Sequence, residues 1–182
     1  MTSFNLKKHY KEKVVDNLKK KFDISNVMAI PKLDKIVINR GLGEATVTPA
    51  LIETSVNQFI TLTGQKPILR KSKKAISNFK LRENQIIGCK VTLRRDKMYE
   101  FLSKFINLSA AKIRDFRGFS DSFDKDGNIT IGIRESESIF PELSGTSVDK
   151  PLGLSITIVT TAKNKEQAKY LLTEMGFPFR KK

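Results

Sequence analysis

The chain is poor in the residues that build catalytic, metal or disulfide centres. It has one cysteine (Cys89), one histidine (His9) and no tryptophan among 182 residues. A single cysteine excludes an internal disulfide and a cysteine-built zinc site, and it indicates a reducing compartment. No apolar run approaches the ~18 residues of a membrane helix, and the N-terminal segment has the pattern of neither a secretory signal nor a transit peptide. We therefore expect no metal, no cofactor and no membrane partner.

The few candidates for chemistry have simpler explanations. His9 lies in a lysine-rich helical pattern, where a solvated side chain or an RNA contact is favoured over a general base. Cys89 falls on the apolar side of a predicted strand, where buried packing is expected. The segment 41–43 lacks the third glycine of a dinucleotide loop, and the segment 124–128 lacks the ligand set of a calcium loop, so it predicts a tight turn. Neither an enzyme nor a small-molecule substrate is expected.

Acidic residues are scarce in one segment, Thr63 to Lys97. It holds eleven of the 34 Lys and Arg residues but only two acids, a net charge of +9 out of +15 for the chain, whose pI is about 9.9. The segment from Met98 to Pro151 has a net charge of −2. A solvated face is the ordinary explanation of a single charge run. Charge concentrated in this way favours a phosphate polymer, which releases condensed counterions on binding.

The length and composition predict a single domain over residues 1–182 with a substantial core. Tyr10, Val14, Leu18 and Phe22 are spaced four apart, which predicts an amphipathic N-terminal helix over 6–22. A second helix is predicted over 48–62, with Thr48 as N-cap, Gly64 as its end and an inward stripe listed as Ile52, Val56, Phe59 and Ile60.

Alternating residues predict strands over 35–40, 88–94, 128–134 and 153–161, and a short strand is predicted over 67–71. A helix is predicted from Asp96 with Met98, Phe101, Leu102 and Phe105 inward. The last helix follows Asn164, which forms a predicted capping box with Gln167. The order indicates an α+β fold: a largely antiparallel sheet with helices on one face and an open polar, RNA-facing side. The residues predicted on the open side are Asn39, Lys90, Thr92 and Arg94.

The chain also resembles a known family over nearly its whole length. The motifs are KEKVV, INRGLGEA (38–45), TGQKP (63–67), IGCKVTLR (87–94), IRDFRG (113–118), IFPE (139–142), TIVTTAK (157–163) and the terminal FPFRK. They resemble the large-subunit ribosomal protein family numbered five, in its bacterial and organellar form. The resemblance implies a non-enzymatic protein of the central protuberance whose partners are 5S rRNA, 23S-type rRNA, P-site tRNA and small-subunit ribosomal protein number thirteen.

Site residues implied by the resemblance fall into three groups. The expected 5S rRNA contacts are Asn39, Gln65 and Thr92, with the neighbouring cations Arg40, Lys66, Lys90 and Arg94. The basic arm, residues 71–88, is inserted between two strands and is expected to reach tRNA through Lys71, Lys73, Lys74, Asn78, Phe79, Lys80 and Arg82. The expected intersubunit bridge residues are Arg114, Asp115, Arg117, Glu135 and Glu142.

Several alternatives stay open at this stage. Phe79 either stacks on RNA or packs on its own arm, and Asn78 stands where the family usually has glycine. After Arg134 the chain departs from the family pattern, and the acids there either meet a basic partner or form a solvated face. A free RNA-binding regulator explains the charge equally well, and a nuclease less well. The expected location is the ribosome, either in bacterial cytoplasm or in the stroma or matrix of an organelle that encodes the protein itself; among organelles the plastid is favoured.

Overall fold

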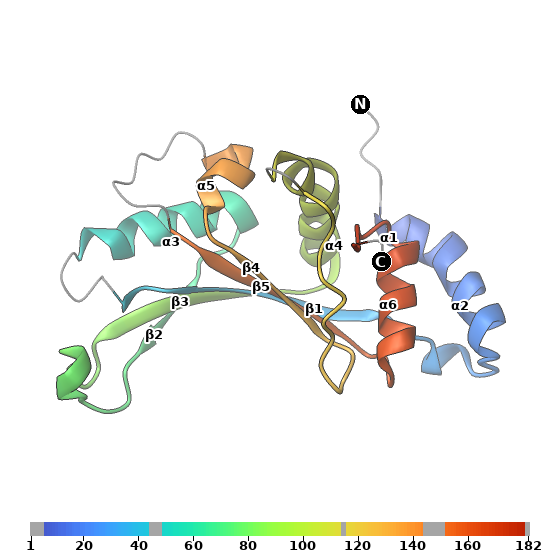
Figure 1. Ribbon diagram of the computed structural model, residues 1–182, viewed down its shortest axis with the longest axis horizontal. Helices are drawn as coiled ribbons and strands as arrows, with labels where there is room; N and C mark the ends of the chain where they lie inside the picture. Colours follow the sequence, from blue (N-terminus) through green and yellow to red (C-terminus); the bar gives the residue numbers. More distant parts are fainter. Residues whose placement is uncertain (1–5, 44–48, 114–115, 144–151, 181–182) are drawn as a thin grey trace. The chain divides into compact units, whose positions relative to one another are not determined.

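The computed structural model describes residues 6–43, 49–113, 116–143 and 152–180, and it confirms the predicted α+β fold (Figure 1). Within these residues, five strands form one sheet in the order β2-β3-β1-β5-β4. Their bounds are β1 (Leu33–Gly41), β2 (Ile68–Lys71), β3 (Ile86–Leu93), β4 (Ile129–Ile133) and β5 (Leu154–Thr160).

The helices alternate with these strands along the chain. The N-terminal helical stretch comprises α1 (Leu6–His9), a π-helical turn η1 (Tyr10–Val14) and α2 (Val15–Phe22). The longer helices that follow are α3 (Ala50–Thr63), α4 (Arg95–Lys104) and α6 (Lys165–Glu174). The short ones are η2 (Val27–Ala29), η4 (Ser77–Phe79), η5 (Phe105–Ser109), η6 (Ala110–Lys112), α5 (Ser136–Ile139) and η7 (Pro141–Leu143).

The chain divides into two compact units. The first unit comprises Met1–Ile36, Leu93–Ile131 and Thr157–Lys182, and the second comprises Val37–Thr92 and Gly132–Ile156. Strands β1, β3, β4 and β5 each contribute residues to both units.

Strand alternation follows the prediction on every long strand. Ile36 and Ile38 of β1 are buried whereas Asn39 is exposed. In β3, Cys89, Val91 and Leu93 are buried while Lys90 and Thr92 are only half-buried, and the three isoleucines of β4 are buried. Successive side chains point to opposite faces of a sheet, so one face forms the core and the other stays polar. In the second unit, α3 and α5 lie on the same side of the strands (Figure 1).

Buried side chains of its helices form much of the core of the first unit. Val14 and Leu18 of the N-terminal helical stretch are fully buried, as predicted, and the Tyr10 hydroxyl donates to the Pro31 carbonyl oxygen at 2.9 Å. All four predicted inward residues of the stretch that begins at α4 are buried. Among the described residues, no helix combines the length and the apolarity that crossing a bilayer requires.

Two helix predictions need correction. The capping box of α6 is incomplete: Asn164 is the N-cap residue but makes no side-chain capping bond, and Gln167 accepts from the Lys163 N–H at 3.3 Å instead. In α3 the buried residues are Ser55, Gln58, Phe59, Leu62 and Thr63, whereas Ile60 is 41% exposed and Ile52 and Val56 are half-buried. Polar residues of α3 turn inward because they bind a buried arginine, described below. Gly64 ends α3 in the left-handed region as predicted, and Thr48 lies outside the described residues.

Candidate nucleic-acid interface

Three hydrogen-bonding side chains of the second unit have no partner among the described residues. Asn39 is exposed on β1, and Thr92 is half-buried on the neighbouring strand β3. Gln65 is exposed just after Gly64, where its backbone contacts the Thr63 hydroxyl. Within the described residues, the side chains of Asn39, Gln65 and Thr92 make no hydrogen bond. They are therefore available to an external ligand.

Cations accompany these polar groups. Lys90 lies two residues before Thr92 on the same face of β3, and Lys66 is exposed beside Gln65. In the antiparallel ladder of β2 and β3, Lys90 pairs with Ile68, which is 66% exposed, and Gly88 pairs with the exposed Arg70. A Cβ on Gly88 would lie 2.8 Å from the Arg40 carbonyl oxygen, so glycine permits the close approach of β1 to β3 at this point.

Arg40 corrects the predicted RNA-contacting set. Its side chain points to the buried face of β1 and is 1% exposed, so it does not present a charge to solvent. Its guanidinium donates to Gln58 Oε1 at 2.5 Å, to Ser136 Oγ at 2.8 Å, to Gly153 O at 3.2 Å and to Ser55 Oγ at 3.4 Å. The physical reason is strand alternation: Asn39 faces outward, so its neighbour Arg40 faces α3.

Burial shapes the electrostatics around Arg40. Desolvation lowers the pKa of the Arg40 guanidinium, and Cys89 and Glu137 oppose that shift. Gln58 connects Arg40 to Glu137. Its Oε1 accepts from the Arg40 guanidinium, and its amide nitrogen donates to Glu137 Oε1 at 2.9 Å. The Arg40 side chain also lies over the Phe59 ring at 5.2 Å. We call these residues the Arg40 network, and sequence reasoning missed it because its members are distant along the chain.

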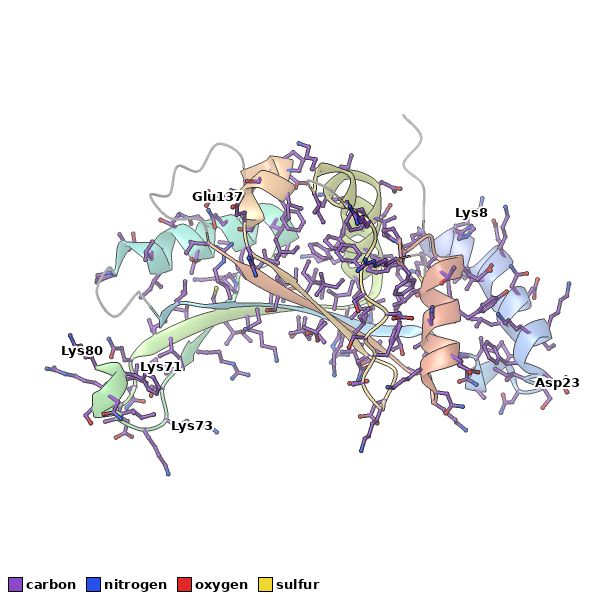
Figure 2. The ribbon with its side chains drawn as sticks, in the orientation of Figure 1. Lys8, Asp23, Lys71, Lys73, Lys80 and Glu137 are labelled. Carbon is purple, nitrogen blue, oxygen red and sulfur yellow. The ribbon has the colours of Figure 1, made fainter. Side chains whose placement is uncertain are left out.

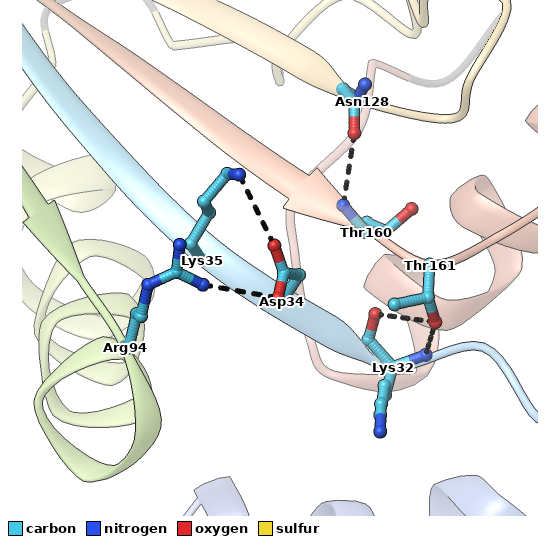
Figure 3. Close-up of polar contacts among 7 residues, drawn as sticks. All are labelled: Lys32, Asp34, Lys35, Arg94, Asn128, Thr160 and Thr161. Atoms are coloured by element: carbon cyan, nitrogen blue, oxygen red, sulfur yellow. Dashed lines mark hydrogen bonds and ion pairs between the residues drawn. The ribbon is translucent and has the colours of Figure 1, made fainter. Parts of the chain in front are cut away.

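Arg94 lies in the first unit, one residue beyond the end of β3, and is exposed as predicted. Its guanidinium pairs with Asp34 Oδ1 at 3.4 Å, and Lys35 pairs with the other carboxylate oxygen of Asp34 at 3.5 Å (Figure 3). Two cations thus share one carboxylate, and the local charge remains positive.

The basic arm continues the β2–β3 hairpin through further backbone hydrogen bonds. The Ser72 N–H donates to the Gln85 carbonyl at 2.8 Å, the Asn84 N–H returns to the Ser72 carbonyl at 3.1 Å, and Ile76 bridges Leu81 near the tip. The exposed cations along it are Lys71, Lys73, Lys74, Lys80 and Arg82. Figure 2 shows Lys71, Lys73 and Lys80 gathered at this end of the second unit, far from Glu137.

The tip of the arm settles two open questions about its residues. Phe79 is 75% exposed, so the alternative that it packs on its own arm is wrong. Asn78 lies in the 3-10 turn η4 without a positive φ, so the missing glycine causes no strain there; Lys80 takes the left-handed conformation instead, with φ of 50°.

The predicted bridge residues are only partly described. Arg114 and Asp115 lie outside the described residues. Arg117 is exposed in the first unit, and Glu135 and Glu142 are exposed in the second. Glu135 accepts a hydrogen bond from the Ser138 hydroxyl at 3.1 Å.

The candidates for catalysis or metal binding in the sequence, Cys89, His9 and the segment 124–128, contribute to packing, hydrogen bonding and a turn. Cys89 is buried, and desolvation raises the pKa of its thiol to about 11, partly opposed by Arg40. His9 Nε2 lies 3.1 Å from the Glu174 carbonyl oxygen. The segment 124–128 forms the predicted turn, with Asp124 Oδ1 accepting from the Asp126 and Asn128 N–H groups. In the described part of the chain, no three His, Cys, Asp or Glu residues are placed to hold a metal ion.

Comparison with known proteins places the chain among ribosomal proteins of the large subunit. The model for the C-terminus of the ribosomal L5 family matches residues 86–179, and the model described as ribosomal protein L5 matches residues 26–82. The chain belongs to the ribosomal protein L5 family. Ribosomal location and rRNA binding follow from this membership, and the resemblance found in the sequence motifs is confirmed.

Individual relatives cover nearly the whole chain. Large ribosomal subunit protein uL5 of Chlorobium phaeobacteroides (strain DSM 266 / SMG 266 / 2430) is 56% identical over 178 residues, 97% of this chain and 91% of the relative. The protein of the same name from Chlorobium luteolum is 56% identical over 174 residues, covering 95% and 89%. Large ribosomal subunit protein uL5c of Gracilaria tenuistipitata var. liui is 55% identical over 175 residues, covering 96% and 97%.

Proposed function

We propose that this large-subunit ribosomal protein binds 5S rRNA through the open side of its second unit. The observation that carries the proposal is the set of unused polar groups on Asn39, Gln65 and Thr92, the last two each within two residues of a lysine that reaches solvent. Amide and hydroxyl groups fix the register of an RNA backbone, and nearby cations supply affinity by counterion release. Double-stranded RNA is recognised mostly by shape, phosphate and 2′-hydroxyl contacts, which suits a face with few aromatic rings.

A salt titration against 5S rRNA separates the two roles. Thr92→Val removes a hydroxyl while keeping a β-branched side chain, and it should cost ~1–3 kcal/mol of binding at every salt concentration. Lys90→Gln should instead reduce the slope of log K against log salt by about 0.9. Lys125→Gln, an exposed lysine in the turn of the first unit, is the matched control and should change neither quantity. If Thr92→Val and Lys90→Gln alter the slope equally, the division of roles is wrong.

The basic arm is proposed to contact P-site tRNA. Its five exposed cations and the exposed Phe79 ring suit a single-stranded or looped RNA element, because phosphate pairing and base stacking act together there. Deleting Lys73 to Glu83 and joining Ser72 to Asn84 through Asn-Gly should preserve the hairpin, since these two residues already pair across it.

The variant with the shortened arm is tested in assembled ribosomes by its affinity for 5S rRNA and by the dissociation rate of P-site tRNA. We expect 5S rRNA affinity to remain and P-site tRNA to dissociate faster. A variant with Lys73, Lys74 and Lys80 all changed to Gln keeps the arm's length and tests whether charge alone is responsible. Loss of 5S rRNA binding on deletion would show that the arm belongs to the 5S rRNA site.

A bridge to small-subunit ribosomal protein number thirteen is proposed for the acids Glu135 and Glu142. Both are exposed, and a basic partner would complement them. Exchanging both for Gln should weaken subunit association at low salt more than at high salt, because exposed charges are screened. Equal association at all salt concentrations would remove these acids from the bridge.

A further inference from the structure

A hollow in the first unit combines aromatic rings with arginines. Its volume is about 540 Å³, and it is lined by two segments distant in sequence: Phe116, Arg117 and Gly118, and Pro178, Phe179 and Arg180. We call it the aromatic hollow.

Backbone pairing fixes the two walls of the aromatic hollow. The Phe119 N–H donates to the Pro178 carbonyl, and the Arg180 N–H donates to the Phe119 carbonyl, both at 2.9 Å. Gly118 has φ of +97°, and a Cβ on it would lie 2.4 Å from the Arg180 nitrogen. Only glycine allows the segments to approach this closely, so the site is formed by the fold rather than by a loose tail.

The rings of the aromatic hollow are supported from behind. Phe116 meets Phe119 edge-on with centroids 4.8 Å apart, and Phe179 packs against Phe177 at 5.0 Å and Phe123 at 5.8 Å. Phe123 and Phe177 are buried, whereas Phe116 and Phe179 remain partly accessible. Rings held in this way can stack on a ligand at little cost in side-chain entropy.

The described charged residues of the aromatic hollow are positive. Among the described residues, the charged ones that line it are Arg117 and Arg180, and both are exposed. Within the described part of the chain, neither forms an ion pair, and the nearby Asp121 is already paired with Lys169 at 2.8 Å. An anion is the natural complement, and guanidinium groups pair with phosphate in a bidentate manner.

We propose that the aromatic hollow binds one unpaired nucleotide of an RNA strand. Its base stacks on Phe116 or Phe179, and its phosphate pairs with Arg117 and Arg180. Stacking on aromatic side chains together with phosphate pairing is how proteins hold single-stranded RNA. This assignment gives Arg117 an RNA contact in place of the predicted bridge contact. The aromatic hollow belongs to the first unit, whereas the proposed 5S rRNA face belongs to the second.

The test uses the full chain and a hexaribonucleotide containing 5-bromouridine, with ultraviolet crosslinking and mass spectrometry of the adducts. We expect an adduct on Phe116 or Phe179. Replacing the crosslinked ring by Leu should reduce that adduct at least about fivefold, because stacking contributes ~1–3 kcal/mol per base. Replacing it by Tyr should retain the adduct, since the ring still stacks. Circular dichroism and urea unfolding of each variant would establish that the fold is kept.

The arginines are tested by their charge. Arg117→Gln with Arg180→Gln should reduce the adduct, and the salt slope of its formation should fall by about 1.4 for the two charges on a single strand. Lys125→Gln with Lys163→Gln removes the same charge from exposed sites of the first unit and should leave the adduct unchanged. Adducts confined to the basic arm, equal effects of both double variants, or binding of an acidic peptide with no RNA adduct would each overturn the proposal.

Discussion

The Arg40 network offers the sharpest test of how the second unit is built. Replacing Arg40 by Met removes the cation but keeps a side chain of similar length. Four acceptors then lose their donor, although both serine hydroxyls can rotate and Ser136 still donates to the Leu152 carbonyl at 2.7 Å. Gln58 Oε1 and the Gly153 carbonyl oxygen remain without the bonds they make to Arg40.

The expected magnitude follows from these two acceptors. An unsatisfied buried acceptor costs ~1–3 kcal/mol, and relief from burying the guanidinium offsets part of the sum. We expect Arg40→Met to lower the free energy of unfolding by about 2–4 kcal/mol. Arg40→Lys should cost at least as much, because an ammonium keeps the buried charge but lacks the planar fork that serves several acceptors at once.

Urea unfolding measures the stability of these variants, and Arg94→Met is the control. Arg94 is exposed and pairs with Asp34 at 3.4 Å, so its loss should cost less than about 1 kcal/mol. At a temperature where Arg40→Met is folded, its salt slope against 5S rRNA should match that of the unaltered protein. An Arg40→Met variant of unchanged stability, or one whose salt slope falls as in Lys90→Gln, would refute the reasoning.

Two further predictions concern the first unit. Gly118→Ala should lower the free energy of unfolding by more than ~1 kcal/mol, because its φ is positive and a Cβ would strike backbone. The control is Gly132→Ala in the second unit, where an added Cβ would meet no atom beyond the chain neighbours within 4 Å, and it should change urea unfolding little. Burial, with a smaller contribution from a neighbouring tyrosine, raises the pKa of Tyr10 from 10.0 to about 12. The neutral phenol is thus favoured in the folded state, so the contribution of Tyr10 to stability should be constant below pH 10 and be lost as the pH rises through about 12. Tyr10→Phe should make the fall of the free energy of unfolding above pH 10 shallower. It should also cost ~1 kcal/mol at neutral pH, because the bond to the Pro31 carbonyl is lost. If the fall above pH 10 is unchanged in this variant, other groups cause it.

Features of short range were predictable from the chain. Alternation in β3 placed Cys89 inward and Lys90 outward, and Gly64 was correctly predicted to end α3. These predictions succeed because strand periodicity and the conformational freedom of glycine are properties of a few consecutive residues. The same periodicity, applied strictly to β1, already implies that Arg40 and Asn39 face opposite ways. The family resemblance alone had placed both residues in the RNA-contacting set.

The inward face of α3 shows where local pattern fails. Its apolar residues predicted a stripe that includes Ile60, yet the helix turns Ser55 and Gln58 inward. Leaving the buried Arg40 guanidinium without hydrogen-bond partners would cost more free energy than burying one more isoleucine would gain. Arg40 lies on β1, so the sequence of α3 by itself gives no sign of it. Periodicity within a helix carries no information about a partner that lies 15 or 18 residues away.

The sequence by itself determined the class of fold, the two faces of each strand, the concentration of charge and, through its motifs, the family. Tertiary structure alone decided which groups satisfy the buried Arg40, which described polar side chains of the second unit remain without a partner, and that Phe116 and Phe179 line one hollow. The physical reason is the distance along the chain over which each property is set. Periodicity and charge density are sums over neighbouring residues, whereas burial and pairing depend on contacts between segments as far apart as residues 118 and 180.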